Sequence, residues 1–300
     1  MQYSFGLETK QRLRLSRVTG KTTDKPSIQP HMSDNSGTAQ TPSKPFRPVA
    51  ELLIALQFLT RLPIPFVRTV DPVPLAQSMR LFAVAGALIG AINGLVLVVL
   101  SWLQLPDVMA AAITIGFSLF LTGAIHEDGL ADTADGLLGG KTRERRLEIM
   151  RDSRIGTYGA SALVLAILCK ASAYHTLGEV KPWQTILILA ATGAFSRAMV
   201  VDMMWATRSA RSDGLSNLAG RPTRAAALFA IVTGGALTVW AGWFFEPVSG
   251  IEAMAAALVI TALMRRAATR LVGGQTGDIC GAVQVLAEIG MLATFFASIH

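Results

Sequence analysis

A series of long apolar segments constrains this chain more than any other feature of its sequence. The segments cover residues 82–102, 107–125, 158–178, 183–206, 225–245, 250–268 and 280–299. Several reach the roughly 20 residues that a helix needs to cross the hydrocarbon core of a bilayer. A helix spans lipid because it satisfies its own backbone hydrogen bonds. We therefore predict an all-α fold, a polytopic integral membrane bundle of about 6–7 transmembrane helices.

Composition supports this prediction. The chain is 51% hydrophobic and only 16% charged, whereas soluble proteins carry about 25% charged residues. A soluble globular enzyme is therefore excluded as the default. The two cysteines, Cys169 and Cys280, lie far apart in apolar surroundings, which argues against a disulfide framework or a thiolate zinc site.

The positions of the basic residues predict the orientation in the membrane. Lysine and arginine gather in residues 1–47, 126–157, 207–224 and 265–278, while the loops near 103–106, 179–182 and 246–252 hold only Lys181. Cytoplasmic loops are enriched in basic residues, so this alternation favours seven spans with the basic loops inside. The same distribution accounts for the net charge of +7 and argues against a nucleic-acid partner.

The first residues have a different character. Residues 1–47 are basic and rich in Ser, Thr and Pro, with few large apolar residues. They predict a disordered basic tail, with a transit peptide as the alternative and no signal-peptide core. The membrane-embedded domain is predicted to cover residues 48–300. Within it, segment 48–62 carries Glu51 and Arg61, which favours an amphipathic helix lying at the membrane interface.

An acidic run at residues 126–136 is the strongest candidate for chemistry. It holds Glu127, Asp128, Asp132 and Asp135. If the second span continues as a helix through the run, the three aspartates share one face. Converging carboxylates need compensation, and a hard divalent cation such as Mg²⁺ supplies it through oxygen ligands. The alternative is a solvated acidic loop that pairs with the arginines downstream.

A second candidate follows the acidic run. Arg151 and Arg154 flank Asp152, and Gly156 and Gly159 precede a new span. Two guanidinium groups near a helix N-terminus suit an anionic group, and Asp152 is a candidate metal ligand or base. An arginine pair that caps the membrane surface with Asp152 as its partner explains these residues equally well.

Two further places combine polar residues with apolar spans. Arg197 lies inside an apolar segment, five residues before Asp202, and is either a functional group facing the bundle interior or half of a buried ion pair. Residues 273–278 form a glycine-rich turn ending in Asp278. Its freed backbone amides suit phosphate oxygens, but the composition alone is a weak signal.

Taken together, these motifs resemble the cobalamin synthase family of membrane-embedded adenosylcobinamide-GDP ribazoletransferases. The matching stretches are residues 56–65, 126–136, 150–159, 196–197 and 273–278, which stand in the family's order. The chain departs from the family in its long basic tail and in residues 285–288, a looser form of a C-terminal acidic pattern that leaves the role of Glu288 open.

The resemblance implies an Mg²⁺-dependent phosphotransferase of cobalamin biosynthesis in the bacterial cell inner membrane, with its active site facing the cytoplasm. The 3′-hydroxyl of α-ribazole, or of α-ribazole 5′-phosphate, would attack adenosylcobinamide-GDP and release GMP. Asp128, Asp132 and Asp135 would hold Mg²⁺, joined by Glu127, and one of the aspartates or Asp152 would be the base. The substrate would be bound by Arg151, Arg154, Arg197 and Asp278. The sequence leaves a homo-oligomer open.

Two other functions match parts of the sequence less well. A CDP-alcohol phosphotransferase that acts on lipids also uses clustered aspartates, but its motif places arginine where Asp132 follows Ala131. A divalent-cation transporter is expected to place its carboxylates near mid-membrane, whereas this acidic run lies at the end of a span beside arginines.

Overall fold

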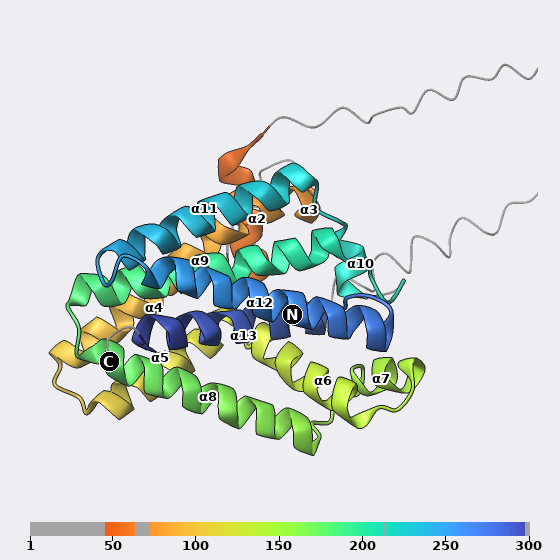
Figure 1. Cartoon of the computed structure of the whole chain (residues 1–300), viewed down its shortest axis with the longest axis horizontal. Coiled ribbons are helices and arrows are strands. Elements are labelled where there is room, and N and C mark those ends of the chain that lie inside the picture. Colours follow the sequence, from red (N-terminus) through yellow and green to blue (C-terminus); the bar gives the residue numbers. More distant parts are fainter. Residues whose placement is uncertain (1–45, 64–72, 213, 298–300) are drawn as a thin grey trace, which may run out of the picture. The chain divides into compact units, whose positions relative to one another are not determined.

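The computed structural model describes residues 46–63, 73–212 and 214–297, and its regular elements in these ranges are helices (Figure 1). The predicted tail lies outside the described residues up to residue 45. The elements are α2 (Pro48–Leu59), α3 (Leu75–Ser78), the 3₁₀ helix η2 (Met79–Leu81), α4 (Phe82–Trp102), α5 (Asp107–Thr122), α6 (Ile125–Gly139), α7 (Arg143–Ile149), α8 (Thr157–Gly178), α9 (Pro182–Ala206), α10 (Leu215–Ala219), α11 (Arg224–Trp243), α12 (Ser249–Val272) and α13 (Gly277–Ala297).

The prediction of a polytopic membrane bundle is confirmed, although the residues that the structure describes contain fewer than seven candidate spans. Five helical stretches are long and apolar enough to cross a bilayer: Leu75–Trp102, α8, α9, α11 and α13. A sixth span exists only if the bent pair of α5 and α6 is counted as one. Helix α12 is long enough at 24 residues, but Glu252 and the arginines 265, 266 and 270 interrupt its apolar character.

A sharp break separates α5 from α6. Gly123 and Ala124 both take left-handed backbone conformations, with φ of 69° and 55°, and the two helices meet at 92°. The second span therefore does not continue straight into the acidic run, but the run itself is helical, as its spacing required, and forms α6. Glycine tolerates this conformation readily, whereas it is costly for alanine. A new helix begins at Ile125, so the axis of the acidic run differs from the axis of α5.

Helix α9 is the most enclosed of the candidate spans, and α4 lies directly against it (Figure 1). A Cβ atom on Gly193 would stand 2.5 Å from the carbonyl oxygen of Gly86. The two backbones therefore touch, which is a common way for membrane helices to pack. This close pair forms the centre of the hydrophobic core.

The amphipathic interpretation of segment 48–62 needs correction. Glu51 does not face solvent but is fully buried. Its carboxylate forms an ion pair with Arg80 at 2.8 Å and accepts a hydrogen bond from the Gln77 amide at 2.9 Å. Helix α2 is thus fixed to the start of the first long helix by its only charged side chain.

Candidate active site

The acidic helix α6 and the last helix α13 approach each other closely. A Cβ atom on Gly129 would stand 2.7 Å from the carbonyl oxygen of Asp278, and one on Gly281 would stand 3.1 Å from that of His126. Glycine at these positions lets the backbones meet. The acidic run and the glycine-rich turn, separated by about 140 residues in the sequence, therefore share one site.

The glycine-rich turn is held by a second loop. The Gln275 amide donates to the carbonyl of Arg208 at 2.8 Å, and the Ala210 amide donates to the carbonyl of Gln275 at 2.7 Å. The Arg143 side chain donates to the carbonyls of Val272 at 2.9 Å and of Ala210 at 3.0 Å. Figure 1 shows α6, α7 and α10 near the end of α12 where these contacts form. The turn is consequently fixed from two sides.

The first turn of α13 orients Asp278. The Thr276 hydroxyl accepts a hydrogen bond from the Ile279 amide at 3.2 Å and donates to the Asp278 carboxylate at 3.2 Å. Thr276 is therefore a side-chain cap of the helix. The cap fixes the direction of the Asp278 carboxylate, which lies beside the acidic run.

Arg211 is a site residue that the sequence assigned only to a basic loop. Its guanidinium lies 3.6 Å from the Asp278 carboxylate and donates to the carbonyl of Leu147 at 2.8 Å. The side chain is 11% exposed, so the positive charge is held in place. The one available signal was a composition of several arginines in residues 207–224, and nothing in it singled out Arg211.

These groups open onto a pocket of about 240 Å³. Asp128, Arg211 and Asp278 form part of its polar lining. The other part is apolar and comes from α2, α4, α9 and α10; it includes Phe58, Leu59, Phe82, Val200, Met204 and Ala219. The lining thus contains a charged group (Asp128, Arg211 and Asp278) and an apolar group that comes mainly from α2, α4 and α9. We refer to these two groups of lining residues as the charged end and the apolar end of the pocket.

Asp128 and Asp132 are the two carboxylates of the acidic run that remain accessible to solvent. Asp128 is exposed and Asp132 is partly exposed. The charged groups that act on Asp132 are the carboxylates of Asp128, Asp278 and Asp135, opposed by the guanidinium of Arg211. Negative charge therefore accumulates here, as the sequence predicted for the aspartates.

Asp135 has a structural contact of its own. Its two carboxylate oxygens accept hydrogen bonds from the backbone amides of Gly156 at 2.7 Å and Gly159 at 2.9 Å. A carboxylate at a helix N-terminus satisfies free amides and complements the helix dipole. Asp135 consequently joins α6 to the first turn of α8.

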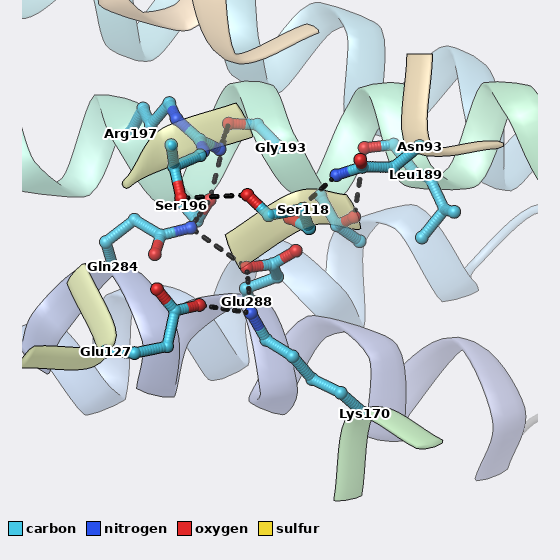
Figure 2. A network of polar contacts seen from close by, with 12 residues as sticks. Asn93, Ser118, Glu127, Lys170, Leu189, Gly193, Ser196, Arg197, Gln284 and Glu288 are labelled. Atoms are coloured by element: carbon cyan, nitrogen blue, oxygen red, sulfur yellow. Dashed lines mark hydrogen bonds and ion pairs between the residues drawn. The ribbon is translucent and has the colours of Figure 1, made fainter. Parts of the chain in front are cut away.

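Glu127 is set apart from the three aspartates. Figure 2 shows it in a buried network with Lys170 and Glu288. The Lys170 ammonium lies 3.2 Å from the Glu127 carboxylate and 3.1 Å from the Glu288 carboxylate. Gln284 donates to Glu288 at 2.9 Å and to the Ser196 hydroxyl at 3.2 Å. Lys170 thus pairs with two buried carboxylates, and one of them is Glu288, whose role the sequence left open.

Arg197 belongs to the same interior region. It is buried, donates to the carbonyl of Gly193 at 3.1 Å (Figure 2), and lines a separate cavity of about 10 Å³ with Glu127. It does not line the larger pocket. Asp202 forms an ion pair with Arg265. The buried ion pair between Arg197 and Asp202 that the sequence offered as an alternative is thus not formed, and Asp202 has a part-buried pair with Arg265 instead.

The segment with Arg151, Asp152 and Arg154 lies on the surface, outside the pocket lining. The Arg154 guanidinium lies 2.7 Å from the Asp152 carboxylate and is 87% exposed. Its hydrogen bonds to that carboxylate lower the pKa of Asp152 to about 2. The partnership of Asp152 with a surface arginine, one of the two sequence interpretations, is what the structure contains.

The donor set leaves room for a metal ion bound with the substrate. Within residues 46–63, 73–212 and 214–297, no three His, Cys, Asp or Glu side chains are arranged to hold a metal by themselves. Mg²⁺ retains several waters and typically takes one or two carboxylates plus substrate phosphates. The chemistry of Asp128 and Asp132, next to a pocket, fits this kind of site.

Sequence comparisons add an independent observation. Residues 51–296 match the family described as Cobalamin-5-phosphate synthase. The chain is 42% identical over 253 residues to the Adenosylcobinamide-GDP ribazoletransferase of Azorhizobium caulinodans, covering 82% of this chain and 95% of the relative. The enzymes of the same name from Bradyrhizobium diazoefficiens and Brucella ovis are 41% and 38% identical, covering 81% and 82% of this chain and 92% and 94% of the relatives. No solved structure matches.

Proposed function

This chain belongs to the cobalamin-5-phosphate synthase family, and from that membership we infer that it is an adenosylcobinamide-GDP ribazoletransferase. It is an enzyme of cobalamin biosynthesis that transfers the cobinamide phosphate group of adenosylcobinamide-GDP to ribazole. The proposal is supported most by one observation: Asp128, Arg211 and Asp278, from three distant parts of the chain, line a single pocket. That pocket joins three of the motifs by which the family is recognised, because Phe58 and Leu59 of residues 56–65 also line it.

The reaction exchanges the phosphoanhydride bond of the pyrophosphate for a phosphate ester bond. The 3′-hydroxyl oxygen of α-ribazole, or of its 5′-phosphate, forms a bond to the cobinamide-side phosphorus, and the bond from that phosphorus to the bridging oxygen of GMP breaks. The hydroxyl proton passes to a base. Such a transfer needs charge stabilisation, alignment and proton removal, with little covalent help from the protein.

The residues of the site can supply these needs. The Arg211 guanidinium, fixed by Asp278 and by the carbonyl of Leu147, is placed to stabilise negative charge on the phosphates. We assign the proton to a carboxylate oxygen of Asp132, which lies beside Asp128 and Asp278. Asp152 is a poor base because the hydrogen bonds from Arg154 lower its pKa to about 2, which makes the carboxylate a weak proton acceptor, and because it lies outside the pocket lining.

We further propose that Asp128 and Asp132 hold Mg²⁺ together with the substrate phosphates. The ion neutralises the charge on the phosphates when it is bound. Glu127 is omitted from this ligand set because its carboxylate pairs with Lys170. Asp135 is omitted because both of its oxygens already accept hydrogen bonds from α8.

The same reasoning supports a bacterial inner membrane protein with its site on the cytoplasmic side. The basic helix α7 binds the end of α12 through Arg143 and Val272, at the end of the bundle that carries the site. Basic residues favour the cytoplasmic face, where nucleotide substrates are found.

An assay of the purified full-length chain in detergent tests the activity. With adenosylcobinamide-GDP and α-ribazole, we expect Mg²⁺-dependent formation of GMP and a cobalamin in equal amounts, and loss of both with EDTA. Asp128→Asn should lower the rate by on the order of 100-fold or more. Glu144→Gln is the matched control, because Glu144 is an exposed carboxylate of α7. Absence of product from folded wild-type protein would refute the proposed function.

A further inference from the structure

We propose that the pocket of about 240 Å³ binds the acceptor nucleoside, with its flat aromatic base in the apolar end and its ribose at the carboxylate end. This inference rests on the proposed function and assigns one substrate to one cavity. The cobinamide part of the other substrate then stays outside the pocket, at its charged end.

The apolar end is suited to a flat aromatic base. Phe58 and Phe82 place their rings 5.8 Å apart at an interplanar angle of 21°, and both line the pocket. Leu59 and Met204 add further apolar surface to the lining. Aromatic and apolar side chains bind nucleic-acid bases by stacking and by removing their faces from water. A benzimidazole base presents such faces.

The size of the pocket selects between the two substrates. Pockets for drug-sized ligands measure roughly 300–1,000 Å³, so a pocket of about 240 Å³ is suited to a smaller group. A corrin ring with its amide side chains is larger than a drug-sized ligand and does not fit inside. A nucleoside, or its base and part of its ribose, matches this space.

Guanine, the other aromatic base in the reaction, matches the lining less well. Its edges carry several hydrogen-bond donors and acceptors, which need partners when they are buried. Phe58, Phe82, Val200 and Met204 offer only hydrocarbon and aromatic surface, and the hydrogen-bonding side chains of the lining are its charged groups together with His126, Ser216 and Thr276. A dimethylbenzimidazole base has methyl groups on the corresponding edge, so it loses no hydrogen bonds in this environment.

The charged end sets the direction of the nucleoside. Asp128, Arg211 and Asp278 lie in the same lining as the aromatic rings. A base in the apolar end therefore directs the ribose hydroxyls toward the carboxylates, where the proton is removed and the phosphate is held. This orientation connects recognition of the base with alignment of the attacking oxygen.

Enlarging a side chain of the pocket tests the assignment. Ala219→Phe adds a ring to a half-buried lining residue of α10, whereas Leu218→Phe changes its neighbour, which is 80% exposed and outside the lining. We expect Ala219→Phe to raise KM for α-ribazole by about tenfold or more, with KM for adenosylcobinamide-GDP unchanged. Leu218→Phe should behave as the wild type.

A second measurement separates this inference from the proposed function. Titration of the full-length protein with α-ribazole alone, followed by calorimetry, should show weaker binding to Ala219→Phe than to Leu218→Phe. A riboside of unsubstituted benzimidazole, which is smaller, should lose less affinity. If Ala219→Phe instead raises KM for adenosylcobinamide-GDP, or changes neither KM, the assignment is overturned while the transferase activity of the wild type stands.

Discussion

The Asp135 carboxylate lies 2.7 Å from the backbone nitrogen of Gly156, which is the N-cap residue of α8. A residue of the acidic run thus binds free backbone amides at the N-terminus of α8, the helix that follows α7. The contact also explains the small residue at position 156, because a Cβ atom there would stand 2.5 Å from the same carboxylate. The contact between the acidic run and the segment at residues 150–159 is therefore structural, whatever these two motifs also contribute to chemistry.

Removal of the contact between Asp135 and the start of α8 should destabilise the protein. In Asp135→Ala, the amides of Gly156 and Gly159 lose their partner, and we expect the free energy of unfolding to fall by about 1–3 kcal/mol. Thermal unfolding in detergent measures the change. Glu144→Ala is the control, because that carboxylate is exposed on the surface of α7. A melting temperature of Asp135→Ala equal to that of the control would contradict the prediction.

The contact between α6 and α13 leads to a prediction about activity. In Gly129→Ala, the new methyl group would stand 2.7 Å from the carbonyl oxygen of Asp278, so the two helices must separate. Displacement of a site by about 1 Å can cost on the order of 100-fold in rate, and we expect a loss of kcat/KM of that order.

Gly139→Ala tests the same substitution elsewhere on α6. The nearest atom to its new methyl group is Ile149 Cδ1 at 3.8 Å, which is an ordinary contact. This variant should keep full activity. Equal activities of Gly129→Ala and Gly139→Ala would show that the close approach of α6 and α13 does not matter for catalysis.

The buried network predicts a large effect on stability. Lys170→Met leaves the Glu127 and Glu288 carboxylates buried without their cation. Breaking a buried ion pair in this way costs about 3–5 kcal/mol, so the melting temperature should fall clearly. The triple variant with Glu127→Gln and Glu288→Gln, which removes the charges together, should recover much of the loss. If the triple variant is less stable than Lys170→Met, the charges are not the cause.

We predict that activity depends on the shape of the Arg211 guanidinium group as well as on its charge. Arg211→Ala should lower kcat by on the order of 100-fold, as expected when a charge-stabilising donor is lost. Arg211→Lys should restore little, because lysine lacks the two-pronged guanidinium. Steady-state kinetics with both substrates measure the effect. The control is Arg208→Ala, since the side chain of Arg208 is exposed; comparable losses in both variants would point to the loop rather than to Arg211.

The pKa of Asp152 gives a prediction about pH. Hydrogen bonds from Arg154 lower this pKa to about 2, below the ordinary value of about 3.9. Because this pKa is lower in the folded protein than in the unfolded chain, the ionised carboxylate stabilises the folded state. This contribution is fully present above about pH 4 and is lost as the pH falls toward 2. Asp152 does not titrate near neutrality. We expect Asp152→Asn to leave the pH profile of kcat/KM unchanged between about pH 5 and 9, and a shifted acidic limb would identify it as the base after all.

The sequence was informative where local pattern decides the structure. Apolar length placed the long helices, and the charged run with its glycines identified α6 and the turn before Asp278. It failed where distant segments meet. Neither the pairing of Lys170 with Glu288 nor that of Asp202 with Arg265 follows from periodicity, because spacing along one helix does not reveal the neighbouring helix.

The break at Gly123 and Ala124 and the role of Arg211 were missed for related reasons. Alanine favours helix, so a left-handed alanine overrides the local preference in order to redirect the chain. Arg211 stands among several arginines, and its position beside Asp278 depends on the pairing of two loops. The charge of a residue is visible in the sequence, whereas its partner is set by tertiary packing.

The distribution of contacts around α6 restricts how that helix can move. On one side Glu127 pairs with Lys170, on another Asp135 holds the start of α8, and Asp128 lines the pocket. Rotation by one residue, about 100°, would break all of these contacts together. The helix therefore has no independent freedom to turn about its own axis. Any motion that opens or closes the carboxylate end must be a swing of the whole helix that carries the start of α8 with it.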